Sequence, residues 1–144
     1  MLSNTSRYAI RAAIYLALNA KEGSKIGIKQ ISKELQIPSP FLGKILQSLA
    51  KQKLLSSTKG PNGGFGLARD ATEITLYDIV NIIDGDDLFK KCLISLRSCV
   101  EENKPCPIHA KYEKIRADIT ALFKDHTIAD LANDIKNSEL NIVI

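Results

Sequence analysis

Residues 39–69 carry the strongest structural signal of the chain and read SPFLGKILQSLAKQKLLSSTKGPNGGFGLAR. Pro38 disfavours helical geometry at the residue before it, the Ser39 hydroxyl can cap free backbone N–H groups, and Pro40 suits a first helical position. A helix is therefore predicted to begin at Ser39, with that residue as its cap. Its apolar residues have the spacing of one buried helical face: Leu42, Ile45, Leu46 and Leu49. The remaining faces hold mostly polar, basic or small side chains.

A second helix is predicted just before this one, because Ile28, Ile31 and Leu35 recur at helical spacing. Two helices joined by a tight turn are typical of a helix-turn-helix, whose second helix enters the major groove of DNA. A helical hairpin in any α domain would have the same pattern. This segment alone therefore leaves both interpretations open.

A β-hairpin, called the wing below, is predicted directly after the helix. Residues 54–58 and 65–68 have strand character, and a glycine-rich turn runs from Lys59 to Gly64. Glycines permit positive φ angles and let backbone N–H groups approach a phosphate or the minor groove. A nucleotide-phosphate loop is the competing interpretation, but the turn lacks the G-x-x-x-x-G-K-[ST] order and a following helix.

Further helices are predicted on both sides of this region. Residues 6–20 form one, and another begins after Thr75, with Asp78 completing a capping box, and ends near Gly85. Residues 88–105 show little apolar periodicity and are expected to form a loop, and residues 127–135 a short closing helix. The fold class is mainly α with a small β-hairpin, a winged helix-turn-helix DNA-binding domain.

A long helix is predicted from Pro107 onward. Its apolar residues alternate steps of four and three: Ile108, Tyr112, Ile115, Ile119 and Leu122. This stripe could pack within the chain, but a helix that follows a complete small domain has few partners left there. We therefore expect a dimerisation helix and the following organisation: 1–84 DNA-binding domain, 85–106 cysteine-bearing loop, 107–144 dimerisation helix and tail.

The positive charge of the chain is concentrated in one segment. The net charge is +4, from 20 basic and 16 acidic residues. Residues 35–69 contain five of the basic residues and no Asp or Glu, so the rest of the chain carries a net charge of −1. A segment free of carboxylates suits a surface that binds a polyanion, although a solvated basic face without a partner has the same composition.

Composition also excludes several classes of protein. Apolar residues make up 44% of the chain, which is enough to fill a core. No stretch has the ~18 consecutive apolar residues of a membrane span, and the first residues lack the pattern of a secretory signal. We therefore expect a cytoplasmic protein with no membrane partner.

All three cysteines fall within one 15-residue span, and a histidine follows the last of them. Six residues separate Cys92 from Cys99 and Cys99 from Cys106, and Pro107-Ile108 separate Cys106 from His109. Three thiolates and an imidazole can hold an iron–sulfur cluster or a tetrahedral zinc. The wide spacing favours a cluster, because zinc sites usually contain C-x₂₋₄-C pairs; free thiols or a redox pair are the other interpretation.

An enzyme with a reactive cysteine is an alternative to a DNA-binding protein. It would need a base beside the nucleophile, and only His109 and His126 are available, with no paired-carboxylate motif near either. We therefore expect a protein that is not an enzyme.

The order of these features resembles one family of bacterial winged-helix regulators. It includes the iron–sulfur cluster assembly regulator, the nitric-oxide-sensitive repressor and the cysteine metabolism repressor. The resemblance extends from Ser6 to about Asn133. Its most specific parts are the wing run K-G-P-N-G-G-F and the C-P-I-H end of the cysteine segment.

The resemblance implies a homodimer that binds a pseudo-palindromic operator in double-stranded DNA and represses or activates transcription. The implied DNA contacts are Ser6, Arg7, Ser39, Phe41, Gly43, Lys44, Gln47, Lys59, Gly60, Pro61, Asn62, Gly63 and Gly64. The implied cluster ligands are Cys92, Cys99, Cys106 and His109, and the histidine favours a 2Fe-2S over a 4Fe-4S cluster. Such a cluster would set operator affinity by sensing redox state, nitric oxide or iron–sulfur status.

The sequence also departs from the family pattern. Each interval between cysteines is one residue longer than in the cluster binders, and Gly43-Lys44 replace an acidic or amide residue early in the second helix of the motif. Family members without a cluster exist as well. The alternative function is a regulator of the same fold, with zinc or no metal, that is switched by thiol oxidation, a metabolite or a partner protein.

Overall fold

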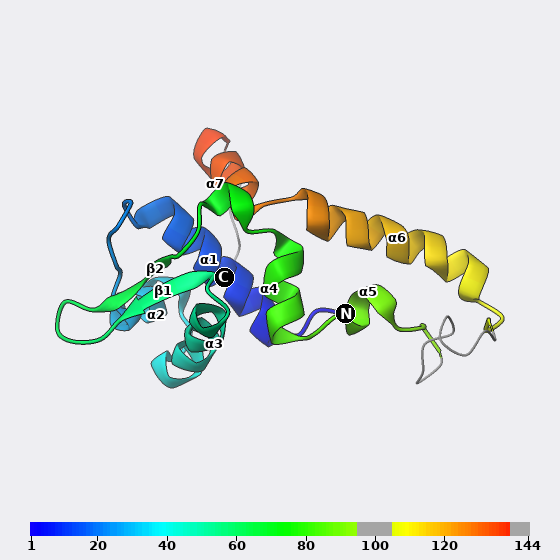
Figure 1. Cartoon of the computed structure of the whole chain (residues 1–144), viewed down its shortest axis with the longest axis horizontal. Coiled ribbons are helices and arrows are strands. Elements are labelled where there is room, and N and C mark those ends of the chain that lie inside the picture. Colours follow the sequence, from blue (N-terminus) through cyan, green and yellow to red (C-terminus); the bar gives the residue numbers. More distant parts are fainter. Residues whose placement is uncertain (95–104, 139–144) are drawn as a thin grey trace.

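The computed structural model describes residues 1–94 and 105–138. Within them it has the following elements: α1 (Asn4–Asn19), α2 (Ile28–Leu35), α3 (Ser39–Lys51), β1 (Leu55–Thr58), β2 (Gly64–Leu67), the 3-10 turn η1 (Ala71–Glu73), α4 (Leu76–Ile83), α5 (Asp87–Lys90), α6 (His109–Asp125) and α7 (Ile128–Asn137). This order confirms the predicted winged-helix fold, mainly α with one hairpin (Figure 1). None of the described helices is both long and apolar enough to cross a membrane.

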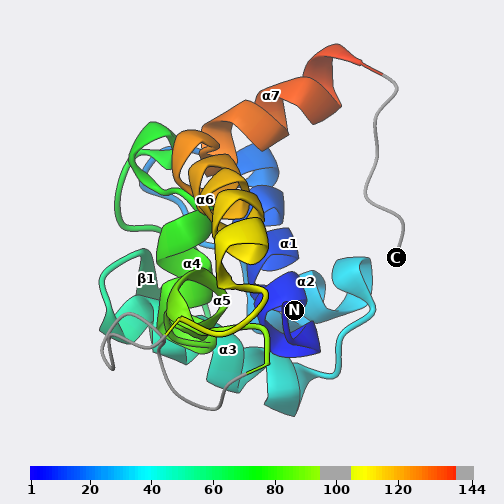
Figure 2. The ribbon, with the colours of Figure 1, turned by 90° about the vertical axis from the view of Figure 1, so that its right-hand side faces the viewer.

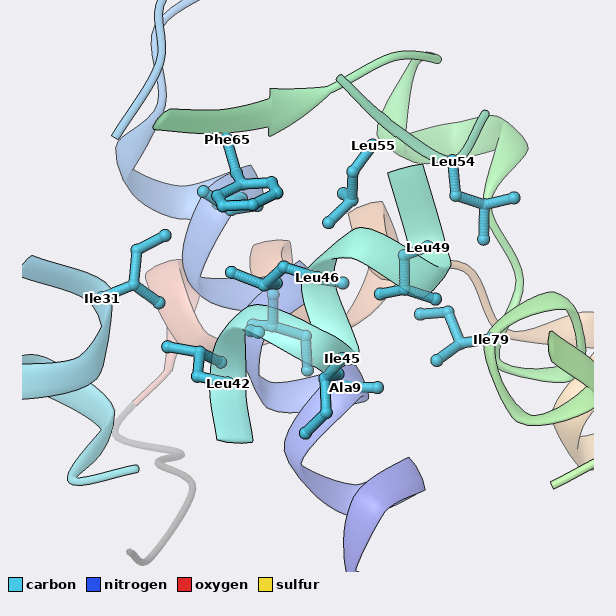
Figure 3. Packing of buried hydrophobic residues seen from close by; sticks show 14 of the residues in the cluster. Ala9, Ile31, Leu42, Ile45, Leu46, Leu49, Leu54, Leu55, Phe65 and Ile79 are labelled. Atoms are coloured by element: carbon cyan, nitrogen blue, oxygen red, sulfur yellow. The ribbon is translucent and has the colours of Figure 1, made fainter. Parts of the chain in front are cut away.

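Helix α1 lies at the centre of the molecule. Three alanines on its buried side, Ala9, Ala12 and Ala13, leave room for neighbouring elements to pack closely. Helices α2, α3, α4 and α7 and strand β2 all contact it. Figure 3 shows the resulting core, in which Leu46 and Leu49 of α3 lie among side chains from the wing and α4. Residues of α1, α2, α3, the wing, α4 and α7 therefore share one continuous hydrophobic core.

The turn between α2 and α3 is tight and well hydrogen-bonded. Gln36 ends α2 in the left-handed conformation at φ 55°, and the Ser32 hydroxyl donates to the Ile37 carbonyl at 2.5 Å. Helix α3 begins at Ser39 as predicted, but the expected side-chain cap is wrong. Ser39 is already the first helical residue and Pro38 holds the cap position without a side-chain cap hydrogen bond, because Pro38 has no polar side chain.

The wing is an antiparallel pair of strands with Leu55 opposite Leu67 and Thr58 opposite Gly64. Residue Ile26, before α2, adds a short bridge to its outer edge, with both backbone hydrogen bonds to Phe65 at 2.9 Å. The side chain of Phe65 is buried in the core. The wing is therefore fixed to the helices at its base, and its tip projects from the body (Figure 1).

The segment after the wing differs in part from expectation. The capping box of Thr75 and Asp78 at the start of α4 is confirmed. The predicted loop from residue 88 is wrong at its beginning, because residues 87–90 form α5, and Phe89 is buried against Tyr77 of α4 and Phe123 of α6. The ring centroids are 4.6 Å and 5.5 Å apart in these two contacts.

Helix α6 begins at His109, two residues later than predicted, and none of its residues is fully buried. It projects away from the body, whereas α7 turns back onto α1 (Figure 1). Ile128 and Ala132 of α7 are buried there, and a capping box of Thr127 and Asp130 begins that helix. The chain after α6 thus returns to the core around α1.

Candidate DNA-binding surface and cysteine site

Helix α3 presents one buried and one exposed face. Its apolar residues are buried in the core, and Phe41, Lys44 and Gln47 are exposed. The Phe41 ring, 40% exposed, packs edge-on against Tyr8 of α1, with ring centroids 5.8 Å apart. Ser39 and Gly43 are half-buried, and a Cβ atom on Gly43 would lie 3.2 Å from Ile28, so this glycine allows α2 and α3 to pack closely.

The wing tip places backbone and basic groups in solvent. Lys59, Gly60, Pro61 and Asn62 are exposed, and Gly63 and Gly64 are half-buried. The Gly63 N–H donates to the Gly60 carbonyl at 2.9 Å, which closes the turn. A Cβ atom on Gly63 would lie 2.1 Å from the Thr58 carbonyl oxygen, so only glycine fits there. The predicted wing residues are thus brought together at one end of the hairpin.

Two DNA contacts are predicted at the beginning of α1, and the two residues differ in burial. Arg7 is exposed, whereas Ser6 is fully buried. A contact between the Ser6 hydroxyl and a phosphate would therefore require the start of α1 to move. Ser6 instead belongs to the helix start, where its N–H donates to the hydroxyl of Ser3 at 3.0 Å.

A carboxylate at the end of α4 holds this helix start. Asp84 accepts from the Ser3 N–H at 3.0 Å and from the Ser3 hydroxyl at 2.5 Å. Partial burial alone would raise the pKa of Asp84, but the hydrogen bonds from Ser3 and the nearby N-terminal charge hold that pKa below its usual value. Asp84 therefore links α1 to the segment that leads to the cysteines.

Two of the three cysteines lie close together, at the two ends of the segment 92–106. The sulfur atoms of Cys92 and Cys106 are 3.1 Å apart, and both residues are half-buried. Cys92 follows α5, and Cys106 lies three residues before α6. Cys99 lies outside the described residues.

His109 is the first residue of α6. Its N–H donates to the Cys106 carbonyl at 2.9 Å, and its Nε2 atom lies 3.4 Å from a carboxylate oxygen of Glu113. Within residues 1–94 and 105–138, no three His, Cys, Asp or Glu side chains come close enough to hold one metal ion. The two adjacent thiols are donors that an iron–sulfur cluster accepts, and the structure does not bring the His109 ring to them.

Two further features near the cysteines were not predicted. The Arg116 guanidinium of α6 donates to the carbonyls of Lys90 and Lys91 at 3.1 Å and 3.4 Å, directly before Cys92. A pocket of about 450 Å³ lies between the N-terminus, α5 and α6 and reaches Cys92. Figure 2 looks along α6 onto this end of the molecule. The sequence shows no signal for either feature, because both arise from residues distant in the chain.

Known proteins are similar to this chain over most of its length. Residues 2–134 match a family model described as Rrf2, iron-dependent transcriptional regulator. The chain is 39% identical over 134 residues to a protein of Aquifex aeolicus (strain VF5) named as an HTH-type transcriptional regulator, with 92% of each chain covered. It is 28% identical over 133 residues to the HTH-type transcriptional regulator IscR of Klebsiella pneumoniae (strain 342), covering 92% of this chain and 80% of that one.

A solved structure shows the same fold. CymR, the global cysteine regulator of B. subtilis, superposes with a TM-score of 0.75 at 21% identity, covering 92% of this chain and 96% of that chain. The winged-helix prediction is confirmed by this likeness.

Proposed function

Because the chain belongs to the Rrf2 family of transcriptional regulators, we propose that it is a homodimer that binds a pseudo-palindromic DNA operator through α3 and the wing. The relatives are named as transcription regulators, so the protein is a regulator and not an enzyme. Its proposed place of action is the cytoplasm.

The observation that carries the DNA-binding proposal is the exposed face of α3 beside the glycine-rich wing. Lys44 and Gln47 project from α3, whose opposite face is buried, and the whole segment 35–69 has no carboxylate. We propose that α3 enters the major groove, where Gln47 and Ser39 contact base edges, and that Asn62 of the wing also reaches bases. Arg7, Lys44 and Lys59 contact phosphates, and the glycines at the wing tip let the backbone approach the sugar–phosphate chain.

This surface is tested by selecting an operator from random double-stranded DNA and measuring its dissociation constant by fluorescence anisotropy at several salt concentrations. Lys44→Ala and Lys59→Ala should each weaken binding and reduce the slope of log K against log salt by about 1. The matched control is Lys136→Ala. Lys136 is an exposed lysine of α7, and that helix lies on the opposite side of the molecule from α3 (Figure 1). Unchanged affinity and slope in both test variants would contradict this docking.

We propose that Cys92, Cys99, Cys106 and His109 hold an iron–sulfur cluster, of the 2Fe-2S type, that sets operator affinity. Support comes from the adjacent thiols of Cys92 and Cys106 and from the iron-dependent description of the family. A bound cluster would supply a redox-active centre that senses redox state, nitric oxide or iron–sulfur status. The protein's own contribution is to hold the two thiols together between α5 and α6.

The alternative is a regulator of the same fold without a cluster, switched by thiol oxidation, a metabolite or a partner protein. The likeness in fold to CymR, which is named for cysteine regulation, supports it. The thiol pair itself is compatible with either function.

The two functions are separated by an anaerobic absorption spectrum with iron and sulfide analysis. A cluster regulator should show sulfur-to-iron bands and about two irons per chain, both lost in Cys99→Ala and reduced in His109→Ala. The matched control is His126→Ala, since His126 is exposed at the far end of α6. Protein without iron or sulfide after anaerobic preparation would favour the cluster-free regulator.

A further inference from the structure

Cys92 and Cys106 form a sulfur pair that is close enough to react. Their sulfur atoms are 3.1 Å apart, although 14 positions separate the residues in the chain. A disulfide bond measures about 2.05 Å, so the two atoms need to approach each other by only about 1 Å. The pair brings the two ends of the cysteine segment together.

Contacts of the elements on either side help to hold the two cysteines in place. Before Cys92, α5 is anchored by the buried ring of Phe89 and by the Arg116 guanidinium, which binds its last carbonyls. After Cys106, the His109 N–H binds the Cys106 carbonyl at the start of α6. The proximity of the two sulfur atoms therefore follows from the packing of α5 against α6.

A small oxidant has a route to this pair. The pocket of about 450 Å³ that Cys92 lines is also lined by Asp87, Lys91 and Tyr112. It is partly open to solvent, and a peroxide molecule is much smaller than its volume. Cys92 is thus the thiol that a peroxide entering from this pocket meets.

We propose that Cys92 and Cys106 are a two-electron redox site that closes to an intramolecular disulfide when the metal-free chain meets a peroxide. The Cys92 thiolate attacks one peroxide oxygen, which breaks the O–O bond, forms a sulfenic acid and releases hydroxide. The Cys106 thiolate then attacks the Cys92 sulfur, forms the S–S bond and expels a second hydroxide. Both hydroxides take up protons, so two thiols and one hydrogen peroxide give one disulfide and two waters.

This site deepens the alternative function, in which thiol oxidation switches the regulator. It concerns the full chain without metal and does not require Cys99. If the protein binds no cluster, the pair is its redox site at all times. If it binds one, the pair is available once the cluster is lost. Iron analysis tests the cluster and thiol chemistry tests the pair, so the failure of one proposal leaves the other measurable.

The test treats the full-length protein with a chelator and a reductant, then with hydrogen peroxide, and blocks remaining thiols by alkylation before mass spectrometry. We expect loss of two of the three thiols, a mass decrease of about 2 Da before alkylation, and a peptide that links Cys92 to Cys106. Cys99→Ser should form the same link, whereas Cys92→Ser and Cys106→Ser should not. Far-UV circular dichroism of each variant verifies that the helices are retained.

Two outcomes would overturn the proposal. One is a wild-type disulfide that includes Cys99. The other is a folded Cys99→Ser variant that keeps two alkylatable thiols after peroxide treatment. A Cys92–Cys106 link in both wild type and Cys99→Ser supports it.

Discussion

Asp84 is the residue that ties the first helix to the segment carrying the cysteines. It accepts two hydrogen bonds from Ser3, whose hydroxyl in turn accepts from the Ser6 N–H. Asp84→Ala removes this acceptor, and we expect a loss of about 1–2 kcal/mol in the free energy of unfolding at pH 7. Urea unfolding measures it, with Asp118→Ala at an exposed position of α6 as the control. Equal stability of both variants would contradict the role of Asp84.

The same contact makes stability depend on pH. Because folding lowers the pKa of Asp84 below 3.8, the folded state binds its proton more weakly than the unfolded state. The stabilisation is therefore present above the unfolded pKa and is lost as the pH falls through the lower, folded value. Asp84→Asn should reduce this loss of stability below about pH 4, measured by urea unfolding at several pH values. Part of the dependence of the free energy of unfolding on pH should remain, since Asp70, Asp86 and Asp130 also have lowered pKa values.

Gly64 shows which part of the wing the sequence could predict. The glycine-rich turn itself follows from composition, and the structure confirms the hairpin. What the sequence could not show is the reason for this glycine, because Ile26 lies 38 positions earlier in the chain. A Cβ atom on Gly64 would lie 2.2 Å from the Ile26 carbonyl oxygen, so the glycine lets the base of the wing meet the residue before α2.

We expect Gly64→Ala to destabilise the protein by more than about 2 kcal/mol, because its Cβ atom meets a backbone oxygen that cannot move without breaking the bridge to Phe65. The thermal midpoint and urea unfolding both measure this loss. Gly27→Ala is the matched control, since Gly27 has an ordinary φ of −65° and nothing within 4 Å of an added Cβ. Comparable losses in the two variants would contradict the steric explanation.

At the level of elements, prediction succeeded where local signals were strong and failed where packing decides. Periodicity and the Thr75–Asp78 capping box located α4, and alternating steps of four and three located α6. Helix α5 was missed because four residues are too few for a periodic pattern. Its stability comes from the aromatic contacts of Phe89 with Tyr77 and Phe123, which no local window contains.

Phe89→Ala tests whether this packing holds α5. Removing the ring should open α5 locally, because a single helical turn is not stable by itself. The amides of Lys90 and Lys91, which donate to carbonyls of Asp86 and Asp87, should exchange with deuterium at least about tenfold faster. Leu93→Ala is the control, since Leu93 is 57% exposed. Unchanged exchange in Phe89→Ala would show that Arg116 alone is enough to hold α5.

For the whole molecule, the sequence predicted the winged helix-turn-helix and a long helix after it, but not the return of the chain to α1. Helix α7 covers α1 with Ile128 and Ala132, so the last described helix completes the core of the DNA-binding region. A short helix with one apolar side gives no indication of which surface it covers. Among the described α-helices, α6 alone has no buried residue.

The exposed apolar stripe of α6 predicts that the protein forms a dimer. Ile115 is 55% and Leu122 is 53% exposed, an unfavourable arrangement for a monomer and a suitable one for packing against a second α6. Burying these side chains in both copies would stabilise a dimer by several kcal/mol, at about 1.5–3 kcal/mol for each full burial. Ile115→Glu places a charge in this interface, so we expect a monomer in sedimentation velocity at micromolar concentration.

The DNA-binding helices of the monomer should stay folded, because Ile115 contributes nothing to the buried core. Binding to a two-half-site operator should nevertheless weaken by more than about tenfold, since one half-site then binds without the other. Ala117→Glu, at an exposed position of α6 outside the stripe, adds the same charge and should remain dimeric. A dimeric Ile115→Glu protein with normal operator affinity would contradict the pairing of α6 with α6 and direct attention to another face of the molecule.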